Sequence, residues 1–171
     1  MFVLLSSLAM AQDVSVSYFG DQLVHPGVKV GLERPLVSRT SRWREMERSI
    51  YVAPNLGLSW HPDHHTALFV NGEVGLRRTR SSGWKRELIL GLGAMRSANA
   101  SPTYTSDGSR VRVDGHTYFM PSVAVGFGRD LSGVRDLPLA WHVRPTLYLQ
   151  GPYNASIVPG VALETGLTWS F

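Results

Sequence analysis

The feature that most constrains this chain is the strict alternation of side-chain character along its last stretch, residues 157–171. One set of alternate positions carries Ile157, Pro159, Val161, Leu163, Thr165, Leu167, Trp169 and Phe171. The other set carries Val158, Gly160, Ala162, Glu164, Gly166, Thr168 and Ser170. A two-residue period is that of a β-strand, because successive side chains point to opposite faces. The stretch therefore predicts a long strand with one oily face and one face of small residues.

Similar segments recur along the chain, and no segment has a helical period of useful length. The expected strands are residues 14–20, 26–37, 49–60, 66–79, 84–97, 117–130, 139–150 and 155–171. Eight strands bring the last beside the first with both termini on one side, as a closed barrel requires. The segment 14–20 is the weakest of the set, and without it seven strands would remain.

Composition limits the remaining choices. The 171 residues suit one domain, and the absence of Cys excludes disulfides and thiolate sites. No apolar run reaches the roughly 18 residues of a membrane-spanning helix. The net charge of +4 comes mostly from Arg. No stripe of Lys and Arg alternates with aromatic residues, so the sequence argues against nucleic acid as a partner.

The character of the polar face indicates which face points inward. Gly, Ala, Ser and Asn dominate it, whereas a face in water would carry mainly Lys, Glu, Arg and Thr. Small side chains fit the cramped interior of an eight-stranded barrel, and the oily face then meets lipid. The predicted fold is all-β, a closed antiparallel up-and-down eight-stranded transmembrane β-barrel. Alternation alone also allows a soluble lipocalin-like barrel that holds a small apolar ligand inside.

Single charges are scattered over the small-residue face, and buried charges persist only when they are paired. We expect an ion-pair network that fills and rigidifies the lumen, formed by Lys29, Glu33, Glu73, Arg77, Glu87, Arg144 and Glu164. Eight strands leave too little bore for a porin. Near the strand ends, an aromatic girdle at the membrane interfaces is predicted from Trp60, Trp84, Trp141 and Trp169.

The first residues, 1–11, form an apolar run that closes in Ala9-Met10-Ala11, which is typical of a signal-peptidase site. We expect residues 1–11 to be the remnant of a signal peptide and residues 12–171 to be the barrel domain. Because the run lacks a basic leading region, the true start is expected upstream.

Five prolines share the pattern Pro, small or polar, apolar, any, apolar, and all lie on the oily face. They are Pro26, Pro54, Pro121, Pro145 and Pro159. Proline lacks the N–H that a closed ladder needs. We interpret the five as bulges or as the first paired residues of strands.

The carboxyl terminus, with Phe171 preceded by Trp169 and Leu167 on one face, resembles the C-terminal assembly signal of bacterial outer-membrane β-barrels. Nearly the whole mature chain is similar in build to the OmpA and OmpX type of transmembrane domain. The resemblance implies a Gram-negative outer-membrane protein without cofactors, recognised by the barrel-assembly machinery and embedded in outer-membrane lipid. It also implies a structural or surface-interaction role, with outer loops that meet lipopolysaccharide or partners.

With both termini periplasmic, the outward loops include residues 98–116, and the inward turns include residues 38–48. The inward segment 38–48 is rich in Arg, with Arg39, Arg42, Arg44 and Arg48. We interpret it as a solvated turn; if the segment 14–20 were not a strand, this basic segment could instead face outward and meet lipid phosphates.

Two chemical alternatives remain. A rim metal site could be formed by His61, Asp63, His64 and His65, although their spacing matches no specific motif. The other alternative is a lipid A-modifying acyl hydrolase or transferase. The sequence shows no catalytic set for it, and His142, the one histidine within a predicted strand, has no Ser nearby in sequence and is interpreted as a hydrogen-bonded lumenal residue.

Overall fold

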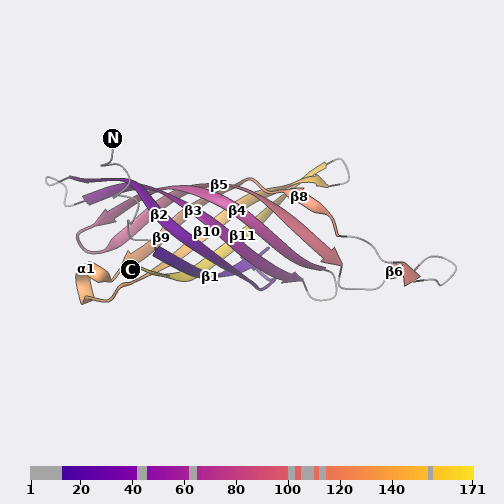
Figure 1. Ribbon diagram of the computed structural model, residues 1–171, viewed down its shortest axis with the longest axis horizontal. Coiled ribbons are helices and arrows are strands. Elements are labelled where there is room, and N and C mark those ends of the chain that lie inside the picture. The colour runs from indigo at the N-terminus through magenta and orange to yellow at the C-terminus, as the bar shows by residue number, and fades with distance from the viewer. Residues whose placement is uncertain are drawn as a thin grey trace, which may run out of the picture.

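The computed structural model describes residues 13–41, 46–61, 65–99, 103–104, 110–111, 115–153 and 156–171. The predicted signal-peptide remnant, residues 1–11, lies outside the described residues and stays a prediction. In the described part, long antiparallel strands wind around one axis and give the molecule an elongated shape (Figure 1).

The strands follow one another up and down around the ring, each paired with its neighbours in the chain. The wall consists of β1 (Asp13–Asp21), β2 (Gly27–Ser41), β3 (Met46–His61), β4 (His65–Arg80), β5 (Trp84–Asn99), β8 (Thr117–Phe119), β9 (Ser122–Asp130), β10 (Leu139–Tyr153) and β11 (Ser156–Trp169). Because β8 and β9 occupy the single predicted segment 117–130, the ring has the eight predicted strand positions.

The ring closes between its first and last strands. β1 pairs antiparallel with β11 from Val14 opposite Trp169 to Asp21 opposite Ala162. On its other edge β1 pairs with β2. The segment that was weakest in the sequence is therefore the strand that completes the cylinder, and the predicted up-and-down eight-stranded fold is confirmed.

Side chains divide between wall and lumen with the predicted alternation. In β3, Leu56 and Leu58 are 54% and 47% exposed. Tyr51 and Ala53, which have the opposite parity along the strand, are buried. Phe69, which breaks the alternation in the sequence, is buried as well. The large aliphatic side chains thus face mainly outward, and the inner face carries the charged and small residues with a few aromatic rings, which excludes the lipocalin-like alternative.

The two ends of the barrel differ. The terminal end holds the start of β1, the C-terminus and the short helix α1 (Ser132–Arg135). The opposite end, the loop end, carries the small hairpin of β6 (Thr103–Tyr104) and β7 (Arg110–Val111) (Figure 1). This hairpin lies within the predicted long loop 98–116.

The expected inward turn at residues 38–48 is mostly strand, so that interpretation was wrong. Ser38, Arg39 and Thr40 pair with Ser49, Arg48 and Glu47, and the β2–β3 hairpin extends beyond its apolar part. Its polar side chains look like a loop in sequence, but a β-ladder is made by backbone groups and tolerates them where both faces are exposed.

The bulge interpretation of the prolines holds only in part. Pro121 separates β8 from β9, and Pro26 directly precedes β2. At Pro145 the β9–β10 pairing stops at Val143 and resumes in register at Thr146, while β10 pairs continuously with β11 there. At Pro54 the β2–β3 pairing likewise stops and resumes without a shift, while β3 pairs continuously with β4. These two prolines interrupt one ladder without adding a residue.

Among the described residues, no helix has the length and apolar character needed to cross a membrane.

Candidate functional site

The interior of the barrel holds a closed ring of four charges contributed by four strands. Arg144 on β10 donates to Glu87 Oε2 at 2.9 Å and to Glu33 Oε1 at 2.9 Å. Arg77 on β4 forms ion pairs with the other oxygens of the same two carboxylates. Each arginine thus bridges both glutamates, and all four carboxylate oxygens are used. Such pairing offsets the cost of burying the charges.

A second group lies beside this ring. Lys29 Nζ lies 2.9 Å from Glu73 Oε1 and 2.6 Å from Glu164 Oε2. Asn71 donates to Glu73 Oε1 at 3.0 Å, and Thr146 donates to Glu164 Oε1 at 3.2 Å. The structure therefore places all seven charged residues that were predicted for the lumen inside it, and each takes part in an ion pair.

Sequence reasoning missed one lumenal cation at the terminal end. Lys85 is 7% exposed and lines a polar cavity of about 170 Å³. The residues that line this cavity come from β1, β2, β3, β4, β5 and β9, and they include Asp13, Glu33, Tyr51, Arg77, Lys85 and Asp130. Because Lys85 directly follows the girdle candidate Trp84 and precedes the exposed Arg86, its inward position is visible only from strand parity.

Bulky side chains close the lumen toward the loop end. A buried cluster contains Phe19, Phe69, Met95, Tyr118 and Met120. The rings of Phe19 and Phe69 lie 4.8 Å apart between centroids. Phe69 lies against Gly57 of the adjacent strand, where an added Cβ would lie 2.1 Å from the ring. Glycine at that position gives the ring its space, and the cluster fills the bore above the ion pairs.

At the loop end a carboxylate and three histidines lie close together. His61 Nε2 is 2.8 Å from Asp21 Oδ2, and the Tyr148 hydroxyl donates to Asp21 Oδ1. The His61 ring stacks between those of His25 and His65, at 3.6 and 4.2 Å between centroids.

The stacked arrangement bears on the predicted metal site. Among the described residues, no group of three or more His, Asp or Glu side chains is placed to hold a metal ion. Of the four predicted ligands, His61 and His65 are described, whereas Asp63 and His64 lie outside the described residues. A metal site that includes all four stays a prediction.

The structure also brings together a pair that the sequence does not suggest. Ser17 Oγ lies 2.9 Å from His142 Nε2, although the two residues are 125 positions apart. At the other nitrogen of the His142 imidazole, Nδ1, the Thr168 hydroxyl oxygen lies 3.4 Å away. Ser17 and His142 are only 2% and 3% exposed. The pair has the atoms of a nucleophile and a base, but it is enclosed in the lumen and linked to the wall.

The outer wall is apolar and carries the predicted aromatic residues. Trp60, 55% exposed, lies at the loop end, and Trp84 and Trp169, 48% and 43% exposed, lie at the terminal end. Trp84 meets Trp141 edge to face at 5.9 Å between centroids. Leu167, Trp169 and Phe171, the predicted assembly signal, are exposed at 40%, 43% and 80%.

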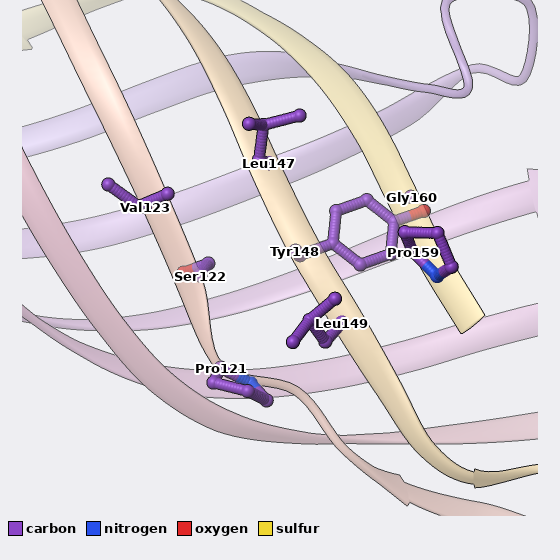
Figure 2. A pocket seen from close by; sticks show the side chains of 8 residues that line it. All are labelled: Pro121, Ser122, Val123, Leu147, Tyr148, Leu149, Pro159 and Gly160. Atoms are coloured by element: carbon purple, nitrogen blue, oxygen red, sulfur yellow. The ribbon is translucent and has the colours of Figure 1, made fainter. Parts of the chain in front are cut away.

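A shallow hollow of about 420 Å³ interrupts the wall toward the loop end (Figure 2). Val123, Leu147 and Leu149 line it with two of the prolines, Pro121 and Pro159. The Tyr148 ring lies beside Gly160 on the neighbouring strand (Figure 2). Its hydroxyl donates to the lumenal Asp21. The hollow is therefore part of the apolar wall and presents no charged group.

Solved structures match this chain in fold. The N-terminal β-barrel domain of Pseudomonas aeruginosa OprF matches with a TM-score of 0.58 and 10% identity, over 94% of this chain and 97% of that chain. The β domain of the Bordetella autotransporter BrkA gives a TM-score of 0.51 at 13% identity, over 92% of this chain and 68% of that one. Neisserial surface protein A gives 0.50 at 12% identity, over 94% and 95%.

No protein-family model matches the sequence, and no curated protein is significantly similar to it. At identities this low the structural likeness concerns the fold alone. The fold is that of the outer-membrane β-barrels, as the carboxyl-terminal pattern indicated, and no specific family is identified.

Proposed function

We propose that this outer-membrane β-barrel is a rigid, closed scaffold that presents its loop end at the cell surface. In this role the barrel transports nothing and catalyses nothing. Its outer loops contact lipopolysaccharide or partner molecules, and its wall holds those loops in place.

The observation that carries the proposal is the filled interior. The four-charge ring around Arg144 and the aromatic cluster around Phe69 occupy successive levels of the lumen. Every buried charge in that ring is satisfied by two partners, so opening a pathway would leave charges unpaired in a low-dielectric interior. A barrel that is costly to open is suited to a structural task.

The outer wall and the two ends of the barrel support its placement in the outer membrane. The exposed tryptophans would anchor the barrel at the two membrane interfaces. The carboxyl-terminal residues Leu167, Trp169 and Phe171 would be read by the barrel-assembly machinery before insertion. The longest connection between wall strands, which contains the β6–β7 hairpin, lies at the loop end, and this supports a periplasmic terminal end.

The enclosed Ser17–His142 pair does not favour the hydrolase alternative. A lipid substrate reaches a barrel from the outer wall or the rim, and both side chains are buried within the lumen. The pair instead ties β1 to β10 across β11. Replacement of Ser17 by Ala is accordingly expected to leave lipid A unmodified, as the unaltered protein does.

Three readouts on the purified, folded protein test the proposal. We expect no conductance steps in planar bilayers, no change in lipid A mass on expression, and binding to lipopolysaccharide aggregates. Replacing residues 103–111 by a short Gly-Ser turn should weaken that binding while the barrel keeps its heat-modifiable migration. Conductance steps, a lipid A mass shift, or binding that survives this and every other loop-end replacement would each overturn the proposal.

A further inference from the structure

Four arginines form a row across the outer wall near the terminal end. The strand register places Arg39 of β2 opposite Arg48 of β3, Arg48 opposite Arg78 of β4, and Arg78 opposite Arg86 of β5. All four side chains are exposed. With a strand spacing of about 4.8 Å, the row runs about 14 Å around the barrel.

The row lies directly beside the lipid-facing belt. Two residues along each strand toward the loop end, on the same outer face, the register aligns a row of apolar residues: Val37, Ile50, Leu76, Leu88 and Val125. Two residues along a strand correspond to about 6.6 Å. The guanidinium groups therefore stand at the edge of the apolar belt, where lipid headgroups begin.

Opposite charge for this row is missing from the wall itself. The described strands carry eight carboxylates: Asp13, Asp21, Glu33, Glu47, Glu73, Glu87, Asp130 and Glu164. Each of them is either buried or lines the lumenal cavity at the terminal end. None of the four arginines has an ion pair among the described residues.

Like charges placed directly opposite on neighbouring strands repel each other. Four guanidinium groups in register therefore favour anions from outside the barrel wall over water alone. Arginine binds phosphate oxygens in a bidentate manner, and this geometry suits the phosphodiester groups at the membrane surface.

We propose that the arginine row, Arg39, Arg48, Arg78 and Arg86, is a binding site for the phosphate groups of anionic phospholipids in the leaflet at the terminal end of the barrel. The inference rests on the membrane placement in the proposed function. It adds a lipid preference that a structural barrel does not need.

Beyond Arg86 and β5, the outer wall at a similar height has different chemistry. The register continues from Arg86 to Phe127 of β9, and Trp84, Arg129 and Trp141 follow in the next row. Arg129 lies over the Trp84 ring at 5.6 Å. Tryptophan rings are typical of the membrane–water interface, and they offer no positive charge to a lipid phosphate. Anionic lipid is therefore expected to collect on one side of the barrel, along β2 to β5.

The test uses the full barrel in phosphatidylcholine vesicles with trace spin-labelled phosphatidylglycerol or spin-labelled phosphatidylcholine. The fraction of motionally restricted label reports which lipid contacts the wall. We expect the unaltered protein to prefer phosphatidylglycerol, and the variant Arg78→Gln/Arg86→Gln to lower that preference at least about threefold. Both substitutions remove like-charge repulsion, so the variant should fold.

A charge-matched control separates the row from net charge. Arg96→Gln/Arg135→Gln removes two exposed arginines, one at the loop end of β5 and one in α1, and should keep the preference. An unchanged preference in the row variant, an equal fall in the control, or no preference in the unaltered protein would overturn the proposal. Insertion into the vesicles with heat-modifiable migration would show in each case that the barrel is folded, so that failure of the lipid preference leaves the proposed scaffold role untouched.

Discussion

Arg77 and Arg78 are neighbours on β4, and they occupy opposite electrostatic environments. Arg77 points into the lumen between Glu33 and Glu87, with its guanidinium 4.3 Å from the centroid of the Tyr51 ring. Arg78 stands on the outer wall between two further arginines, with no carboxylate on the described strands to meet it. In a barrel of this kind, the parity of a residue along its strand decides whether a cation is compensated from inside or left for an external anion.

The difference has energetic consequences. A lumenal arginine of the four-charge ring pairs with two buried carboxylates, so its loss leaves one negative charge uncompensated away from water. An outer arginine is solvated or meets headgroups, and its loss removes only repulsion and lipid contacts. Substitutions inside should therefore act on the stability of the barrel, and substitutions outside should act on what surrounds it.

The largest effect is expected from Arg144→Met, which keeps much of the side-chain volume but removes the charge that Glu33 and Glu87 share with Arg77. The free energy of unfolding in urea, followed by tryptophan fluorescence in detergent micelles, should fall by about 3–5 kcal/mol. Adding Glu87→Gln to this variant should restore part of the loss, because one uncompensated charge is removed as well. A loss below about 1 kcal/mol would show that the ring does not stabilise the lumen.

A smaller effect is expected from the packing of rings over glycines inside the barrel. Tyr51 lies over Gly75 on the neighbouring strand, where an added Cβ would come within 2.2 Å of the ring. Gly75→Ala should lower the free energy of unfolding by about 1–3 kcal/mol. Gly72→Ala is the matched control, since an added Cβ there meets nothing within 4 Å on the outer wall. Equal effects at the two positions would argue against a packed lumen.

The smallest effect on stability is expected from Arg78→Gln on the outer wall. The free energy of unfolding should stay within about 0.5 kcal/mol of that of the unaltered protein, whereas Arg77→Gln, one residue earlier, should cost several times more. Thermal or urea unfolding of the two variants in the same micelle compares them directly. Similar losses for Arg77 and Arg78 would remove the distinction between inner and outer arginines.

Much of the fold was predictable because alternation repeats in every strand. A two-residue period, seen at Leu56 and Leu58 and again at Leu147 and Leu149, indicates strands whose two faces lie in different environments. The scarcity of large polar side chains on the second face then indicated a narrow lumen. These patterns lie within short stretches of the chain, so they can be read from a single sequence.

Contacts that depend on register were not predictable in the same way. The Ser17–His142 contact requires β1, β11 and β10 to be adjacent and correctly aligned, which no short window of sequence contains. The arginine row has the same origin, since its members come from four strands. The unshifted register at Pro54 and Pro145 was also missed, because proline removes one donor whether or not a residue is inserted.

The most direct test of the account asks whether the ring closes, since closure defines inside and outside. The chain has no native Cys, so Val16→Cys/Leu167→Cys introduces one pair that lies directly opposite across β1 and β11. On mild oxidation in the membrane we expect a disulfide that circularises most of the chain and alters its migration on a non-reducing gel. The pair Leu56→Cys/Val70→Cys, across β3 and β4, serves as the positive control. The pair Val16→Cys/Leu90→Cys should stay reduced, and a β3–β4 disulfide without a β1–β11 disulfide would contradict the closed barrel.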